Sequence, residues 1–190
     1  MKPVVWKQSR INTCGPASLM AALHELGIGG LSVQRELTIF RRVRHAYILG
    51  STPAYLARYA LAQGVDARLV QKTPLPSPVP GKNPVQRILH AHLFKVYAKT
   101  AEEYRLAGLP FGQYQEECDI LPPPGPDLSS QAIFLVTDTD GVLHFILARR
   151  HQGSLVVLDP DKGVNTRVSG REFLDRHRQD FMGYCVLLRR

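Results

Sequence analysis

The sequence is poor in cysteine and tryptophan and contains no long uninterrupted apolar run. Its three cysteines, Cys14, Cys118 and Cys185, form no closely spaced pairs, which argues against a disulfide framework or a zinc knuckle and favours a reducing compartment. No stretch approaches the roughly 20 apolar residues of a membrane-spanning helix, and residues 1–7 lack the apolar segment of a signal peptide. We therefore expect a cytoplasmic protein without a membrane span; signal-independent export as an effector is the alternative.

Patterns typical of metal sites and nucleic-acid sites are also missing. None of the seven histidines is spaced with a second ligand as in His-Glu-x-x-His, so we expect neither a metal nor another cofactor. The 24 lysines and arginines exceed the 16 acidic residues and give a net charge of +8, but no basic-aromatic or helix-turn-helix pattern accompanies them. We interpret the excess as a solvated basic surface and expect no nucleic-acid partner.

The order of the predicted elements indicates an α+β fold. Helix signals come first, with apolar residues at helical spacing behind Ser, Thr or Pro starts, at 15–26, 32–43, 52–63 and about 84–106. A short strand is predicted at 65–70. Further β-rich runs separated by turn signals, with a helix at 170–178 before the last, follow at 132–137, 142–149, 154–159 and 184–188. Because alternating βαβ units are absent from this pattern, we expect a helical N-terminal half and a C-terminal antiparallel sheet.

A chain of 190 residues with 44% hydrophobic content can close one core, so we expect one domain spanning residues 1–190. Residues 71–130 are the least regular part, because a proline-rich run ends the preceding strand and 108–126 reads as irregular. The helix predicted between these two segments presents one apolar side, formed by Val85, Ile88, Leu89 and His92. We interpret 71–130 as an insertion.

Cys14 lies at the start of the first predicted helix, where the partial positive charge and unpaired N–H groups of a helix favour a thiolate. Gln8, six residues earlier, carries an amide that could join the Cys14 backbone N–H in binding the oxyanion of a tetrahedral intermediate. Cys118 stands among acidic residues, which disfavour a thiolate, and Cys185 lies in an apolar strand. Cys14 is therefore the predicted nucleophile; the structural alternative is a small side chain packed at a helix start.

His144 interrupts an apolar predicted strand, where an imidazole needs a polar partner. The following strand ends at Asp159. If the hairpin turn centres on residues 151–152, His144 faces Asp159 directly, and if the turn is 152–153 the pair is diagonal; in both registers the two side chains share a face. A carboxylate bonded to one ring nitrogen would leave the other nitrogen to face a thiol. The alternatives are a core histidine satisfied by its surroundings and an aspartate that initiates a turn.

Together these segments resemble the bacteriocin-processing, double-glycine leader peptidase family and its stand-alone relatives in the papain-like superfamily. The matching segments are Gln8-x5-Cys14-Gly15-Pro16-Ala17-Ser18, His144-Phe145 in a strand, and Asp159-Pro160 closing the next strand. In such relatives the cysteine opens a helix, the glutamine completes the oxyanion hole, and the histidine and aspartate come from adjacent strands. The resemblance implies a papain-like fold over residues 6–70 and 131–163. It does not extend to 71–130, which we expect to lie near the cleft and shape the substrate site.

The resemblance and the residue pattern predict a cysteine-dependent acyl-transfer enzyme with a catalytic set of Cys14, His144, Asp159 and Gln8. A peptidase or amide hydrolase acting on a peptide or a small acyl or amide substrate is the first interpretation. The first alternative is a papain-like acyltransferase, transpeptidase or glutamine deamidase with a biosynthetic or effector role. The second is a catalytically inactive papain-like binding module.

Overall fold

The computed structural model describes residues 2–46, 50–76, 83–123, 128–138, 141–178 and 180–190. The helices in these ranges are α1 (Cys14–Glu25), α2 (Val33–Val43), α3 (Pro53–Ala62), α4 (Pro84–Leu106), the short 3₁₀ helix η1 (Glu117–Ile120) and α5 (Gly170–His177). The strands are β1 (Asp66–Lys72), β2 (Phe111–Tyr114), β3 (Ser130–Thr137), β4 (Leu143–His151), β5 (Ser154–Asp159), β6 (Val164–Val168) and β7 (Phe181–Arg189).

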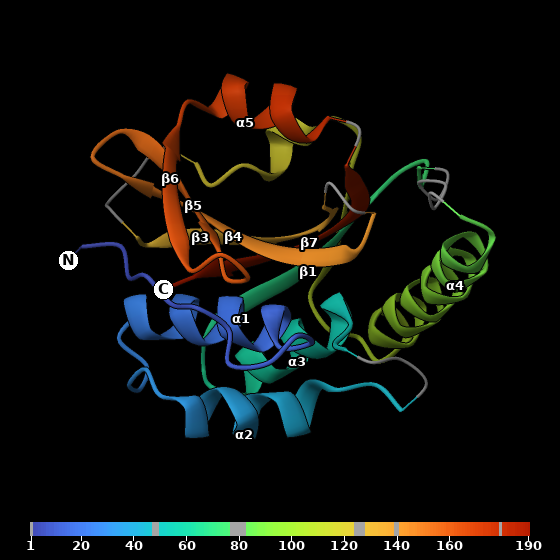
Figure 1. Ribbon diagram of the computed structural model, residues 1–190, viewed down its shortest axis with the longest axis horizontal. Helices are drawn as coiled ribbons and strands as arrows, with labels where there is room; N and C mark the ends of the chain where they lie inside the picture. Colours follow the sequence, from blue (N-terminus) through green and yellow to red (C-terminus); the bar gives the residue numbers. More distant parts are fainter. Residues whose placement is uncertain (1, 47–49, 77–82, 124–127, 139–140, 179) are drawn as a thin grey trace.

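The strands form one twisted sheet in the order β2-β1-β7-β3-β4-β5-β6. Helices α1 and α3 cover one face of this sheet with α2 packed behind them, α5 covers the other face, and α4 stands at the side (Figure 1). All neighbouring strands pair antiparallel except β1 and β2, which are parallel and joined through α4. The result is a mixed α+β fold, as the sequence predicts. The expectation that β-α-β units are absent is wrong for one unit, β1-α4-β2.

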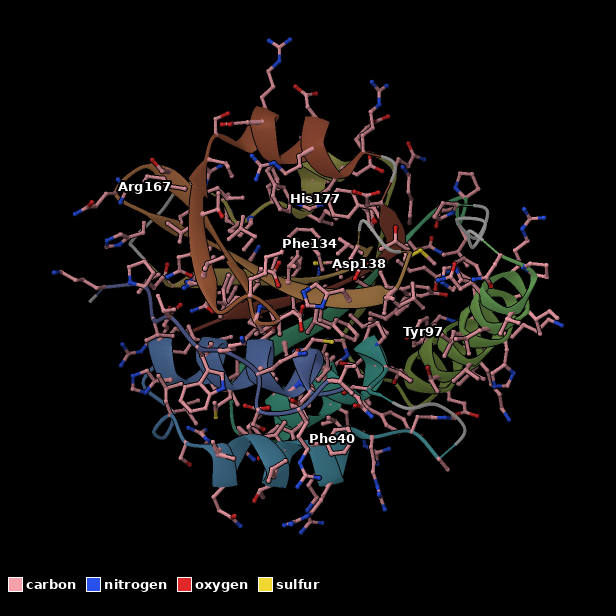
Figure 2. The ribbon with its side chains drawn as sticks, in the orientation of Figure 1. Phe40, Tyr97, Phe134, Asp138, Arg167 and His177 are labelled. Atoms are coloured by element: carbon pink, nitrogen blue, oxygen red, sulfur yellow. The ribbon has the colours of Figure 1, made fainter. Side chains whose placement is uncertain are left out.

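Each face of the sheet carries its own apolar core. Leu19 and Leu23 of α1 pack with Leu135 and Leu147 of the sheet on the helical face. On the opposite face, aromatic rings join the sheet to α5; Phe134 lies between the two layers in Figure 2, with its ring centroid 5.2 Å from that of Phe173. Successive residues of a strand point to opposite faces, so β3 and β4, which lie between these cores, are apolar on both sides.

Buried carboxylates hold the N-terminal segment against the helical layer. Glu36 of α2 is fully buried and accepts hydrogen bonds from Trp6 Nε1 at 2.6 Å and from Ser9 N and Oγ, both at 2.8 Å. Upstream, Glu25 and Arg149 form a buried ion pair with Nε and Oε1 2.9 Å apart, and each also bonds the backbone of the segment at 2.7 Å. Because a buried charge needs polar partners, these contacts fix the path of residues 4–9.

Most predicted elements lie within two residues of the observed ones; Ser32 and Thr52 cap α2 and α3 through their side chains. Strand β6 and strand β2 were not predicted. The apolar side predicted for the middle helix does not face the core, because Val85 and Ile88 are 74% and 73% exposed. The buried residues of α4 are instead His90, Tyr97, Thr100, Ala101 and Tyr104. No helix in the described ranges is long and apolar enough to cross a bilayer.

Candidate active site

Cys14 is the first residue of α1 and is partly exposed. No side chain caps this end of the helix: Thr13 Oγ1, at the capping position, instead donates to the Arg10 carbonyl oxygen at 2.8 Å. The backbone N–H groups of the first turn therefore remain available to an anion beside the thiol. Cys14 therefore opens the first helix, as its sequence position predicts, and its role as nucleophile stays a prediction.

Gly15 allows α1 to approach the sheet closely beside the thiol. A Cβ added at Gly15 would lie 3.1 Å from Phe145 Cδ2 and 3.1 Å from Ser51 Oγ, closer than side chains normally pack. One turn further on, the buried Ser18 Oγ donates to the Phe145 carbonyl oxygen at 3.4 Å. The Cys-Gly-x-x-Ser pattern therefore fixes the distance between the helix start and β4.

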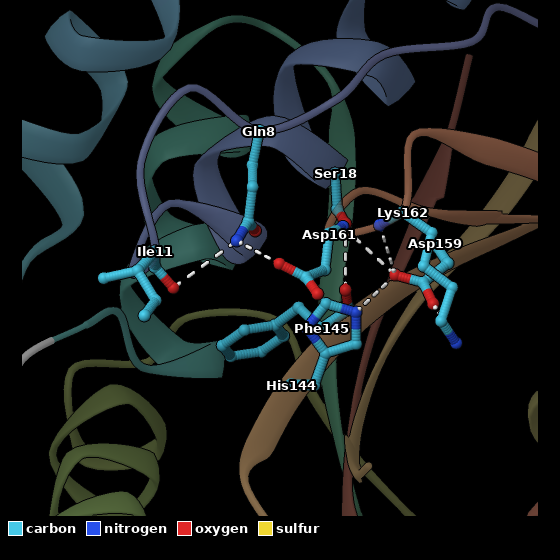
Figure 3. A network of polar contacts seen from close by, with 8 residues as sticks. All are labelled: Gln8, Ile11, Ser18, His144, Phe145, Asp159, Asp161 and Lys162. Carbon is cyan, nitrogen blue, oxygen red and sulfur yellow. Dashed lines mark hydrogen bonds and ion pairs between the residues drawn. The ribbon is translucent and has the colours of Figure 1, made fainter. Parts of the chain in front are cut away.

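Strands β4 and β5 form a hairpin whose turn is Gln152-Gly153. His151 pairs with Ser154, and both turn residues have positive φ values, 50° and 75°, as a type I′ turn requires. Of the two predicted registers, the structure has the one in which His144 is diagonal to Asp159. His144 Nε2 lies 2.9 Å from Asp159 Oδ1 (Figure 3).

The edge of the sheet brings His144 to the helix start. Pairing between β4 and β5 ends at Leu147 and Leu158, so β4 lacks this neighbour at 143–146. By strand alternation His144 belongs to the face of Ile146, which packs in the core beside α5, whereas Cys14 opens a helix on the other face. The imidazole of His144 contacts the Cys14 thiol beyond the end of β5, where α1 packs beside β4. There Ser18 donates to the Phe145 carbonyl oxygen, which β5 does not reach.

His144 and Asp159 have strongly perturbed pKa values. Burial lowers the pKa of His144, but hydrogen bonds to Asp159 and Cys14 and their negative charges outweigh it and raise the pKa to about 10. Burial raises the pKa of Asp159, but hydrogen bonds from His144 and Lys162 and their positive charges hold it well below its ordinary value. The pair is therefore an imidazolium and a carboxylate at neutral pH.

A tight turn after β5 holds the carboxylate of Asp159 in place. Asp159 Oδ1 accepts from the backbone N–H groups of Asp161 at 3.1 Å and Lys162 at 3.4 Å, and Lys162 Nζ lies 3.1 Å from Oδ2. At Gly163, which has a φ of +66°, an added Cβ would lie 2.6 Å from Lys7 Cβ. The N-terminal segment therefore packs directly on this turn.

Gln8 reaches the site through this packing but has different partners from those expected. Its backbone N–H donates to the Pro160 carbonyl oxygen at 2.7 Å. Its side-chain Nε2 donates to Asp161 Oδ1 at 2.9 Å and to the Ile11 carbonyl oxygen at 3.4 Å (Figure 3). The predicted role as oxyanion donor thus requires Nε2 to give up one of these acceptors.

Three residues near this centre were not among the predicted site residues. Asp161 and Lys162 follow Asp159 in the turn, and their only sequence signal is the turn pattern itself. Tyr97 is the third: it is 4% exposed and lies between α4 and the helical layer (Figure 2). Burial, and in addition the charge of Cys14, raise the pKa of the Tyr97 phenol, which indicates that the helix predicted to be part of an insertion borders the thiol.

The other cysteines lie elsewhere. Cys118 is exposed in η1, with its sulfur 3.8 Å from Asp119 Oδ1, and Cys185 is fully buried in β7, where burial raises the pKa of its thiol. Within the described ranges no group of three or more His, Cys, Asp or Glu side chains is arranged to hold a metal ion.

Comparison with known proteins identifies a fold but no family. No protein-family model and no curated protein matches the sequence. Among solved structures, the chain is similar to the peptidase domain of Streptococcus ComA, a bifunctional ABC transporter involved in a quorum-sensing pathway. The match has a TM-score of 0.53 at 15% sequence identity and covers 99% of this chain and 98% of that one. The chain therefore shares the fold of that peptidase domain, consistent with the resemblance inferred from its motifs.

Proposed function

We propose that this protein is a cysteine-dependent acyl-transfer enzyme, and specifically a peptidase or amide hydrolase, in which Cys14, His144 and Asp159 form the catalytic triad. The observation that carries the proposal is the 2.9 Å contact between His144 and Asp159, which holds the imidazole beside the thiol at the start of α1. The fold shared with the ComA peptidase domain supports the same class of reaction.

The chemistry follows from the charge state of the site. Hydrogen bonds and charge interactions raise the pKa of His144, so its imidazole carries the proton that the leaving group needs. The thiolate attacks a carbonyl carbon, a sulfur–carbon bond forms, and the carbonyl electron pair moves onto oxygen, which the uncapped N–H groups of α1 face. His144 then gives its proton to the leaving amine, and the acyl-enzyme forms as the carbon–nitrogen bond breaks.

The second half of the reaction returns the enzyme to its starting state. Neutral His144 accepts a proton from water, the hydroxide attacks the thioester, and the carboxylic acid leaves as the Cys14 thiolate re-forms. Asp159 keeps the imidazole oriented in both steps, because its own carboxylate is fixed by two backbone N–H groups and Lys162. An amine in place of water would complete a transfer reaction at the same site.

A comparison of Cys14 with Cys118 tests the proposal, because Cys118 is an exposed thiol that lies beside a carboxylate, 3.8 Å from Asp119 Oδ1. We expect iodoacetamide near pH 6 to alkylate Cys14 well before Cys118, as peptide mapping would show, and a p-nitrophenyl acetate incubation to leave an acetyl group on Cys14. Alkylation of Cys14 no faster than that of Cys118 would favour a binding module. Partition of the acyl group to added amines rather than water would identify a transferase.

A further inference from the structure

The side-chain amide of Gln8 is fully engaged in this structure. Its Nε2 carries two hydrogens, and it donates them to Asp161 Oδ1 and to the Ile11 carbonyl oxygen. The other amide atom, Oε1, is buried and accepts no hydrogen bond within the described residues. Figure 3 shows Asp161 between Gln8 and the His144–Asp159 pair. In this arrangement Gln8 has no free N–H to offer to a substrate oxygen.

We propose that Asp161 is a positioning residue that withholds the Gln8 amide from the oxyanion site until the oxyanion of the tetrahedral intermediate replaces Asp161 as its acceptor. This inference rests on the proposed function. A carboxylate is a stronger acceptor than a neutral carbonyl oxygen, so a substrate in its ground state competes poorly for the amide. An oxyanion competes well, because it is itself charged. The exchange therefore favours the intermediate over the bound substrate.

The backbone around this contact is fixed independently of the Asp161 side chain. The Gln8 N–H bonds the Pro160 carbonyl oxygen at 2.7 Å, and the Asp161 N–H bonds Asp159 Oδ1 at 3.1 Å. Substitution of Asp161 by alanine keeps both hydrogen bonds and removes only the acceptor for Gln8 Nε2. Asp161 is also exposed, so the substitution creates no cavity in the core.

Two reactions of the same thiol separate this role from a merely structural one. Acylation by p-nitrophenyl acetate passes through an oxyanion: the sulfur–carbon bond forms, the carbon–oxygen bond to the aryl group breaks, and p-nitrophenolate leaves. Alkylation by iodoacetamide displaces iodide without an oxyanion. We expect Asp161→Ala to accelerate acylation about fivefold, as expected for release of one exposed charge-assisted hydrogen bond, and to leave alkylation unchanged. Acylation that is equal or slower in Asp161→Ala would overturn the proposal.

Coupling to Gln8 provides the second criterion. Gln8→Ala should slow acylation by roughly 100-fold, and Asp161→Ala added to it should have no further effect. An acceleration that persists without Gln8 would show that Asp161 acts through its charge alone and would refute the withholding role. Asp66→Ala is the matched control: it removes an exposed carboxylate at the Arg189 end of β1, whereas His144 pairs with Val136 at the other end of β3.

NMR of the Gln8 side-chain amide tests the contact even if Cys14 does not react. In ¹⁵N-labelled wild type the two amide protons should exchange slowly with water, and in Asp161→Ala they should shift and exchange faster. Unchanged resonances would refute the contact itself. If iodoacetamide alkylates Cys14 no faster than Cys118 in wild type and in every variant, the proposed function is refuted instead. The two failures are therefore distinguishable.

Discussion

Replacement of Asp159 by asparagine tests the electrostatic basis of the site. The substitution preserves the size of the side chain and removes the charge that lies 2.9 Å from His144 Nε2. The pKa of His144 is raised from 6.5 to about 10 even though burial acts in the opposite direction. That difference corresponds to ~5 kcal/mol of preference for the imidazolium, shared between Asp159 and Cys14. We therefore expect Asp159→Asn to lower the pKa of His144 by roughly 1–3 pH units.

The same reasoning gives the pH dependence of stability. The pKa of His144 is higher in the folded state than in the unfolded state, so its contribution is complete below pH 6.5 and is lost as the pH rises to about 10. The pKa of Asp159 is lowered, so its contribution is complete above its ordinary value of 3.8 and is lost as the pH falls below it. The free energies of unfolding of wild type and Asp159→Asn should differ most between about pH 4 and pH 6.5, where both contributions are complete, by roughly 1–4 kcal/mol.

Two measurements check this prediction. ¹H–¹⁵N NMR of histidine-labelled protein between about pH 5 and pH 11 follows the His144 ring directly. Urea unfolding at several pH values measures the difference in stability. Asp175→Asn is the control, because Asp175 is an exposed carboxylate 3.9 Å from Arg171 on α5 and should leave the pKa of His144 unchanged. A wild-type pKa near 6.5, or the same pKa in Asp159→Asn, would refute the reasoning.

Three further predictions concern packing. Gly15→Ala should destabilise the protein by roughly 1–3 kcal/mol in urea unfolding, because the new methyl group meets Phe145 at 3.1 Å; equal stability would contradict the close approach of α1. Glu36→Gln should lower the free energy of unfolding by roughly 1–3 kcal/mol, since an amide cannot accept all three hydrogen bonds from Trp6 and Ser9. Unchanged unfolding would show that these bonds are not maintained. Cys185, buried in β7, should react with a disulfide reagent only on unfolding; prompt modification in buffer would place it at the surface.

The sequence predicts the elements that carry Cys14, His144 and Asp159 well because their signals are local. Pro16 and Gly27 mark the ends of α1, so the position of Cys14 follows from neighbouring residues. The strand predicted at 154–159 coincides with β5 because β-branched and leucine residues lie between a Gly153 turn and a proline. Once both strands of the hairpin are known, a two-residue turn allows only registers that put His144 and Asp159 on one face.

The features that could not be predicted depend on residues far apart in the chain. Strand β6 is an edge strand with mostly exposed side chains, so Val164–Val168 has little apolar alternation to identify it. Parallel pairing of β2 with β1 requires the return path of α4, which no local pattern gives. The Gln8–Asp161 contact spans 153 positions and needs the N-terminal segment to pack on the turn after β5, a packing fixed by Glu36.

The crossover from β1 through α4 to β2 lies at one end of the sheet, apart from the hairpin that carries His144 and Asp159. The chain leaves the sheet from β1 and returns to it in the edge strand β2. The hairpin of His144 and Asp159 is separated from β1 by β7 and β3. Tyr97 of α4 nevertheless interacts with Cys14, because burial and the charge of Cys14 both raise the pKa of its phenol. The length and composition of the crossover can therefore change without altering the strand register around His144 and Asp159, and each such change would reshape the neighbourhood of the Cys14 thiol.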